Sequence, residues 1–316
     1  MLVLTDQQAD EMLTRLSSYC KEYSLNVSDV ELRKCIQHLD LVLETNKTTN
    51  LTRILNVEDA AVLHILDSLV LLPYINKAPE GALLDMGTGA GFPGIPLTIA
   101  THRKTTYIDS VGKKVDAVNS FVHALGLKHA HAIHDRLEEY ARSHKKQFSV
   151  VTARALAPLP ILVEYAAPFL KDGGLFVITK GNPSDEELVS GMSAAKICGF
   201  TLLLNDAIDL PEGLGHREFI VLKKSHPASV YGVSYISRSI NSSIAASGQK
   251  KKSRTSNMRH QRNHRSQKRS MLRRLQMPCL TRTGRASIIS TIWFRRQHIC
   301  LPNQRHPHRL SMQNQT

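Results

Sequence analysis

The fold of this 316-residue chain is decided by the stretch Leu83-Leu84-Asp85-Met86-Gly87-Thr88-Gly89-Ala90-Gly91-Phe92-Pro93-Gly94. An apolar run ends in an acid, and three alternate glycines then turn the chain toward a helix. Glycine permits positive φ and lets a ligand approach the backbone closely, while Pro93 and Pro96 suit the first turn of a helix. The N–H groups at the start of that helix are free to face a ligand. The stretch therefore predicts a ligand site between a strand and a helix.

Outward from this turn, short apolar runs alternate with amphipathic stretches. The runs predicted as strands are Ala82–Met86, Thr105–Asp109, His131–His134, Phe148–Thr152, Leu175–Thr179, Phe200–Leu204 and Arg217–Leu222. Such alternation predicts an α/β fold with a doubly wound, mostly parallel sheet of the Rossmann-like kind. The last two strands are joined by residues 205–216 alone, so we expect them to pair antiparallel. Six parallel strands with one late antiparallel strand are the usual methyltransferase variant of this architecture.

The sequence divides into three regions. Residues 1–76 read as a helical extension, with capping-box spacing at Thr5/Gln8 and Ser28/Glu31 and a third helix capped by Asn56 that ends near Pro73. Residues 77–226 form the predicted methyltransferase core. Residues 227–316 lack sustained periodicity and are predicted to be a disordered tail.

Charge is distributed unevenly between these regions. Residues 1–226 carry all 27 Asp+Glu against 23 Lys+Arg, a net charge of −4, whereas the last 90 residues carry 18 Lys+Arg and no acid. One interpretation makes the tail an arm that binds RNA phosphates. The total absence of acids favours the other, a segment translated in a shifted frame or past the natural stop.

Several classes of function are disfavoured by composition. Five cysteines form no C-x-x-C pair, so we expect reduced thiols and no metal site. The chain begins without a signal-peptide pattern, and no apolar run reaches membrane-spanning length. The sequence therefore predicts a cytoplasmic protein with no membrane partner.

Two cofactors compete for the glycine-rich stretch. The segment from Gly89 to Gly94 fits the dinucleotide pattern, and Asp109, 20 residues after Gly89, would bind the ribose of either cofactor. Asp85 discriminates better, because a carboxylate two residues before Gly87 would repel a pyrophosphate but suits the ammonium of S-adenosylmethionine. S-adenosylmethionine is favoured, and an NAD(P)-dependent oxidoreductase is the alternative.

Ordered motifs over residues 1–224 add a family resemblance. They are Asn46-Lys47-Thr48-Thr49-Asn50-Leu51-Thr52, His64-Ile65-Leu66-Asp67-Ser68-Leu69, residues 84–97, Asp109-Ser110-Val111-Gly112-Lys113-Lys114, Thr152-Ala153-Arg154-Ala155-Leu156-Ala157, Thr179-Lys180-Gly181 and Gly215-His216-Arg217. With these motifs the chain resembles the bacterial small-subunit ribosomal RNA methyltransferase G family, also called glucose-inhibited division protein B. The resemblance does not extend beyond about residue 226.

The resemblance implies methylation of 16S rRNA, free or in the 30S particle, at N7 of one guanine in the decoding-region helix. A non-catalytic RNA-binding protein with a vestigial cofactor pocket is a further alternative. The cofactor contacts that the resemblance implies are Gly87, Phe92, Leu137, Glu138 and Arg154. Asp85, Gly89 and Asp109 join them from the argument on the turn itself.

Guanine N7 carries a lone pair and no proton, so its methylation needs no general base. Catalysis can rest on holding N7 in line with the methyl group and excluding water, and no residue is assigned a catalytic role with certainty. Lys180 and Arg217 are the candidates. The cations expected to contact RNA are Lys47, Arg53, Lys113, Lys114, Arg136, Lys180 and Arg217, although a solvated surface is an equally good interpretation for Arg53 and Lys114.

His64, Asp67 and Ser68 share one helix face because of their i, i+3, i+4 spacing. A helix face does not bring three such side chains into a catalytic relay. We favour a hydrogen-bonded packing motif over a contact with RNA or cofactor.

Overall fold

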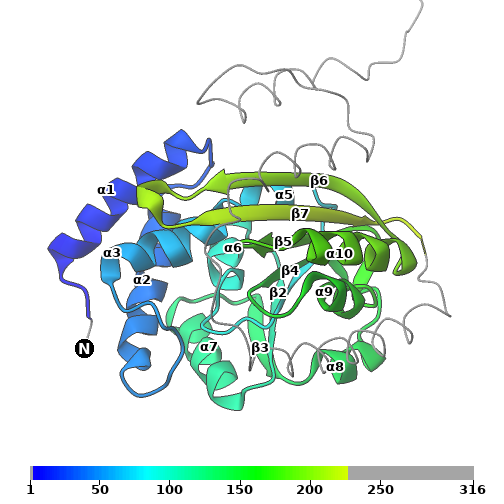
Figure 1. Ribbon diagram of the computed structural model, residues 1–316. Helices are drawn as coiled ribbons and strands as arrows, with labels where there is room; N and C mark the ends of the chain where they lie inside the picture. Colours follow the sequence, from blue (N-terminus) through cyan, green and yellow to red (C-terminus); the bar gives the residue numbers. More distant parts are fainter. Residues whose placement is uncertain (1–2, 227–316) are drawn as a thin grey trace, which may run out of the picture. The chain divides into compact units, whose positions relative to one another are not determined.

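The computed structural model describes residues 3–226, which all fall within one compact unit (Figure 1). The predicted disordered tail, 227–316, and both of its interpretations lie outside the described residues. The helices are α1 (Asp6–Glu22), α2 (Asp29–Asn46), α3 (Val57–Ala60), α4 (Asp67–Leu69), α5 (Leu72–Ile75), α6 (Gly94–Thr101), α7 (Gly112–Ala124), α8 (Leu137–Ser143), α9 (Leu159–Ala166) and α10 (Asp185–Ile197), with a π-helix η1 (Ala61–Leu66) and a 3-10 helix η2 (Pro211–Gly213). No helix in this part of the chain is long and apolar enough to span a membrane.

Seven strands form one sheet in the order β3-β2-β1-β4-β5-β7-β6. They are β1 (Ala82–Met86), β2 (Thr105–Asp109), β3 (Ala130–His134), β4 (Phe148–Arg154), β5 (Leu170–Lys180), β6 (Phe200–Asp209) and β7 (His216–Lys224). Strands β1 to β5 pair parallel, and β7 runs antiparallel to both of its neighbours. The predicted doubly wound sheet with one late antiparallel strand is therefore confirmed. Strands β2 and β3 lie on one side of β1, and β4 and β5 lie on the other side. At this topological switch point between β1 and β4, such folds form a crevice at the carboxyl ends of the strands.

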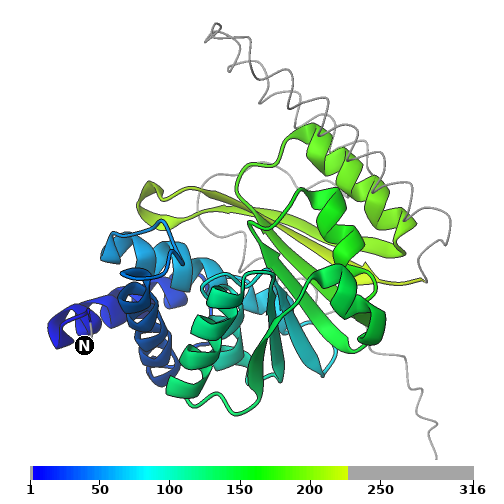
Figure 2. The same ribbon diagram turned by 90° about the horizontal axis from the view of Figure 1, so that it is seen from below.

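Each face of the sheet is buried by its own layer of helices. The first layer contains α6, α7 and the N-terminal helices, and the second contains α8, α9 and α10 (Figure 2). Successive strand residues point to opposite faces: in β1, Leu83 packs into the first layer and Leu84 into the second. This double burial explains why the central strands read as continuous apolar runs.

The N-terminal helices begin at the caps that the sequence predicts. Thr5 and Ser28 each form a complete capping box, and the Asn56 side chain accepts from the Asp59 N–H. These helices share one apolar cluster with α6, α7 and the sheet. The region before β1 is therefore packed into the same core that supports the glycine-rich turn.

Several predicted boundaries are wrong, and β5 begins at Leu170 rather than at Leu175. The helix capped by Asn56 is not a single α-helix: it passes through η1, and Pro73 lies in the first turn of α5, where its missing N–H costs nothing. Strand β6 continues to Asp209 rather than ending at Leu204. It is an edge strand with one exposed face, so polar residues are tolerated along it and obscure its end in the sequence.

Candidate functional site

The glycine-rich turn lies at the carboxyl end of β1. Gly87, Gly89 and Gly91 have φ of 70°, 59° and 91°, a region that disfavours side chains. A Cβ on Gly87 would lie 2.5 Å from the Leu156 Cδ1 atom, whereas beside Gly89 the closest atom is 4.0 Å away. The turn thus exposes backbone to open space at Gly89.

Asp85 stabilises this turn by hydrogen bonds on its buried side. Its carboxylate is fully buried and accepts from the Gly94 N–H and the Thr152 hydroxyl, each at 3.1 Å. Burial raises the pKa of Asp85 to about 6, and these hydrogen bonds oppose that shift. The sequence alone predicts that this carboxylate lies beside a ligand's ammonium group. The hydrogen bonds instead direct it beneath the start of α6.

Asp109 joins the ends of β1 and β2. Its two oxygens accept from the Gly89 N–H at 3.0 Å and the Val111 N–H at 2.9 Å. The side chain is buried at the end of β2 and thereby sets the position of Gly89. This is the place expected for a carboxylate that binds ribose hydroxyls.

Phe92 links the turn to the N-terminal helices. Its ring stacks on His64 with centroids 4.5 Å apart, and His38 lies 4.4 Å from it. The His38 Nε2 atom is 3.0 Å from the Ala90 carbonyl oxygen. Because burial lowers the pKa of His38 to about 3, the ring is neutral at physiological pH, and Nε2 must carry the proton it donates to that carbonyl.

A pocket of about 410 Å³ opens at the ends of β4 and β5 and the beginning of β7. Its lining residues are Ile54, Leu63, His64, Asp67, Arg154, Ala155, Thr179, Lys180, Gly181, Asn182, Pro183, Glu187 and Arg217. The pocket and the turn are neighbours, because Arg154 lines the pocket and its guanidinium lies 5.7 Å from the Phe92 ring.

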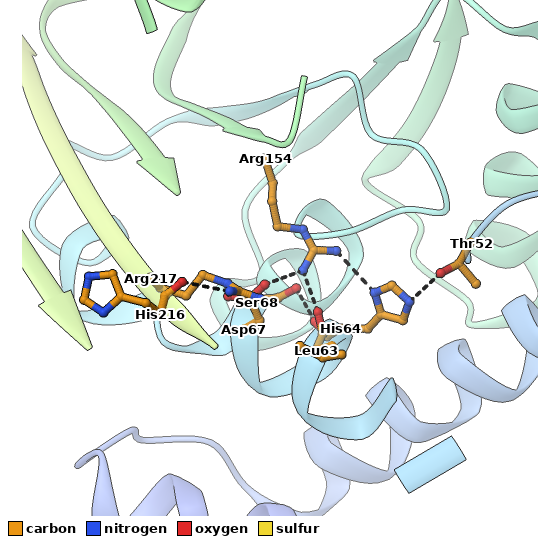
Figure 3. Close-up of polar contacts among 8 residues, drawn as sticks. All are labelled: Thr52, Leu63, His64, Asp67, Ser68, Arg154, His216 and Arg217. Atoms are coloured by element: carbon orange, nitrogen blue, oxygen red, sulfur yellow. Dashed lines mark hydrogen bonds and ion pairs between the residues drawn. The ribbon is translucent and has the colours of Figure 1, made fainter. Parts of the chain in front are cut away.

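Asp67 pairs with both arginines of the pocket (Figure 3). Its Oδ2 accepts from Arg154 Nη1 at 2.9 Å and its Oδ1 from Arg217 Nε at 2.8 Å. The Asp67 side chain is only 2% exposed. A carboxylate buried this deeply would be costly without such partners, so the two arginines and Asp67 act as one charged unit.

His64, in η1, contacts Arg154 of this charged unit. Its Nδ1 lies 3.4 Å from Arg154 Nη2, and its Nε2 lies 2.9 Å from the Thr52 hydroxyl. Burial, and then the charge of Arg154, lower the pKa of His64 to about 3, so the ring is a neutral acceptor for the arginine. Ser68 donates to the His64 carbonyl oxygen at 2.5 Å. The three residues of this helix face therefore form a hydrogen-bonded packing unit that also borders the pocket.

The opposite wall carries a second ion pair. Lys180, at the end of β5, donates to the Ala157 carbonyl oxygen and lies 2.7 Å from Glu187 Oε1. The same Glu187 oxygen accepts from the Leu159 N–H at 2.9 Å. These contacts tie the loop after β4 to the start of α10.

Known proteins are similar to this chain over the same residues. The model of a family described as rRNA small subunit methyltransferase G matches residues 31–208. The enzyme of that name from Alkaliphilus metalliredigens is 35% identical over 212 residues, covering 66% of this chain and 89% of the relative. Its counterpart from Acholeplasma laidlawii is 37% identical, covering 61% of this chain and 84% of the relative.

The chain belongs to the rRNA small subunit methyltransferase G family.

Membership of the rRNA small subunit methyltransferase G family agrees with the sheet order, and the chain has the class I S-adenosylmethionine-dependent methyltransferase fold with an N-terminal helical extension. Among solved structures, a putative sarcosine dimethylglycine methyltransferase from Galdieria sulphuraria superposes with a TM-score of 0.44 at 14% identity, covering 54% of this chain and 88% of the other. Within residues 3–226, no group of three or more His, Cys, Asp or Glu side chains is arranged to hold a metal ion.

The predicted site residues fall into two groups. Those at the carboxyl edge of the sheet are Asp85, Gly87, Gly89, Phe92, Asp109, Arg154, Lys180 and Arg217. The others lie on helices or loops: Leu137 and Glu138 begin α8, and the Glu138 carboxylate accepts from the Tyr165 hydroxyl at 3.0 Å. Arg136 caps the same helix and is exposed.

The remaining predicted RNA contacts lie on the surface. Lys113 is exposed in the first turn of α7, beside the half-buried Lys114, and Arg53 is exposed before α3. Lys47 follows α2 and pairs with Glu44 at 2.5 Å. None of these four side chains is among the residues that line the pocket.

Sequence reasoning missed His38 and Glu187. His38 lies on the buried face of an otherwise ordinary amphipathic helix, and nothing local distinguishes it from a core position. Glu187 is the fourth residue of a Ser184-Asp185-Glu186-Glu187 capping sequence, whose spacing reads as a helix start and conceals a side chain that reaches the pocket.

Proposed function

We propose that this chain transfers a methyl group from S-adenosylmethionine to N7 of a guanine in the decoding region of 16S rRNA. Family membership supports this proposal and argues against the oxidoreductase alternative. The observation that carries it is the adjacency of two structures, the glycine turn and the pocket, which meet where Arg154 of the pocket lies over the Phe92 ring of the turn. Such adjacency suits a reaction between two bound molecules.

The residues of the turn fit the cofactor. Gly89 leaves its backbone accessible, and Asp109 supplies carboxylate oxygens at the end of β2 for ribose hydroxyls. The start of α6 favours a negatively charged group. We assign Asp85 a supporting role, since its oxygens hold Gly94 and Thr152. When bound, S-adenosylmethionine supplies an electrophilic methyl group on a sulfonium. Phe92, Leu137, Glu138 and Arg154 stay predicted contacts.

The pocket receives the target base. Its volume of about 410 Å³ and its mixture of apolar and polar walls suit a purine flipped from the RNA. Asp67 holds both arginines by their guanidinium groups, which keeps a cation from binding the N7 lone pair that must react. The pocket therefore orients the base and excludes water, and no side chain needs to remove a proton.

The surface cations complete the RNA site in this proposal. Lys47, Lys113 and Arg136 bind phosphates around the crevice, since the body of the protein, with a net charge of −4, must rely on local patches. Lys180 and Arg217 contact the base or its phosphate at the pocket.

The test uses tritiated S-adenosylmethionine with 16S rRNA and with 30S particles from a strain that lacks this enzyme, followed by nucleoside mapping. We expect label in 7-methylguanosine at one position. Label at another atom would overturn the assignment of N7, and cofactor binding without transfer to either substrate would favour the non-catalytic alternative. Binding of NADH but not of S-adenosylhomocysteine would instead support the alternative of an NAD(P)-dependent oxidoreductase.

A further inference from the structure

The pocket contains two carboxylates, and they differ in what their oxygens already bind. Both oxygens of Asp67 accept from arginines. Glu187 uses Oε1 for the Leu159 N–H and for Lys180, while its Oε2 accepts no hydrogen bond from residues 3–226. The Glu187 side chain is 24% exposed, so it is held in place yet open to the pocket.

The location of Glu187 defines which part of a base it would meet. In the sheet, β5 lies beyond β4 when counted from β1. Lys180 ends β5 and Glu187 begins α10, so they form a pocket wall that β4 separates from the glycine turn. A purine whose N7 faces the turn directs the C2 end of its Watson–Crick edge away from the turn and toward this wall.

Guanine is the base whose Watson–Crick edge carries two adjacent donors, N1–H and the N2 amino group. A carboxylate accepts from both, whereas adenine offers an acceptor at N1 and no amino group at C2. The charge of Glu187 also matches the reaction: methylation at N7 makes the base cationic, and a carboxylate opposite N1–H interacts more strongly as that charge develops. Lys180 and the start of α10 place positive charge beside Glu187.

We propose that Glu187 is a specificity-determining residue whose Oε2 accepts from N1–H and N2–H of the target guanine. This inference rests on the proposed function, because it places the guanine in the pocket. Thr179, which also lines the pocket, has a buried hydroxyl without a hydrogen-bond partner among the described residues, so this wall retains further capacity to bind a polar edge.

The test compares RNA carrying guanosine at the target position with RNA carrying inosine, which keeps N7 but lacks the N2 amino group. For the wild-type chain we expect kcat/KM to fall about tenfold on inosine, the loss of one charge-assisted hydrogen bond. In Glu187→Gln, transfer to guanosine falls and the ratio of guanosine to inosine approaches one. A residue with a merely structural role would lower both rates and leave the ratio unchanged.

Asp185→Asn is the matched control, since it removes an exposed carboxylate from the same helix turn without entering the pocket. It should keep the wild-type ratio. A second readout is binding of 7-methylguanosine monophosphate against guanosine monophosphate: the wild-type chain prefers the cationic base, and Glu187→Gln loses that preference.

An unchanged guanosine to inosine ratio in Glu187→Gln would overturn the inference, as would equal wild-type rates on the two RNAs. Failure of the proposed function gives a different result, the absence of methyl transfer to either RNA by the wild-type chain. Binding of S-adenosylhomocysteine by Glu187→Gln verifies that the variant is folded.

Discussion

The glycine turn and the pocket beside it are built in different ways. The turn consists of backbone from consecutive residues, fixed by Asp85 and Asp109 at the ends of neighbouring strands. The pocket consists of side chains that lie far apart in the sequence, with Asp67 joining Arg154 and Arg217 across 87 and 150 residues. The first structure depends on backbone conformation and the second on charge balance, so different substitutions should damage each.

The largest effect is expected where a side chain is forced onto the turn. Gly87→Ala combines φ of 70° with a Cβ that meets Leu156, so we expect affinity for S-adenosylhomocysteine to fall by about 100-fold, equivalent to roughly 2.7 kcal/mol. Isothermal titration calorimetry measures this. Gly126→Ala is the control, because Gly126 has φ of 63° and open space around it. It should lower stability by about 1–2 kcal/mol and leave affinity intact. Equal affinity losses in both variants would contradict the assignment of the turn.

A smaller effect is expected from a substitution in the pocket, and it should lower the rate of methyl transfer rather than the affinity for the cofactor. Asp67→Asn removes the charge that balances two arginines, which then become free to reach N7 or to separate. We expect the single-turnover rate of methyl transfer to fall about 30-fold, roughly 2 kcal/mol in activation free energy, with affinity for S-adenosylhomocysteine changed by less than about twofold.

Glu58→Gln is a suitable control for Asp67→Asn, since it removes an exposed carboxylate from the same helical segment. It should retain the wild-type rate. If Asp67→Asn lost cofactor affinity as severely as it lost rate, the turn and the pocket would form one cooperative unit and the distinction drawn between them would be wrong.

The same difference explains how far the sequence could predict this protein. The central strands are visible because each is a buried apolar run. The turn is visible because positive φ favours glycine, here at three alternate positions. The convergence of Arg154 and Arg217 on Asp67 depends on the antiparallel pairing of β5 with β7. Local spacing encodes none of that pairing. The sequence therefore predicts Arg154, Lys180 and Arg217 as site residues but not their pairing with Asp67 and Glu187.

His38, on helix α2, contacts the glycine turn from its buried side. Its replacement is expected to have the smallest effect on cofactor affinity. Its Nε2–H donates to the Ala90 carbonyl oxygen, and its ring packs on Phe92, so helix α2 supports the turn from behind. His38→Leu keeps the bulk and removes the donor. We expect about a fivefold loss of affinity for S-adenosylhomocysteine, close to 1 kcal/mol and typical of one neutral hydrogen bond.

His38→Gln should recover most of that affinity, because its amide reaches the same carbonyl oxygen. Cys35→Ala, a fully buried position on the same helix, provides the comparison: it should lower the melting temperature without changing affinity for the cofactor product. If His38→Gln and His38→Leu bound it equally weakly, helix α2 would support the turn by packing alone. The hydrogen bond would then have no part in shaping the cofactor site.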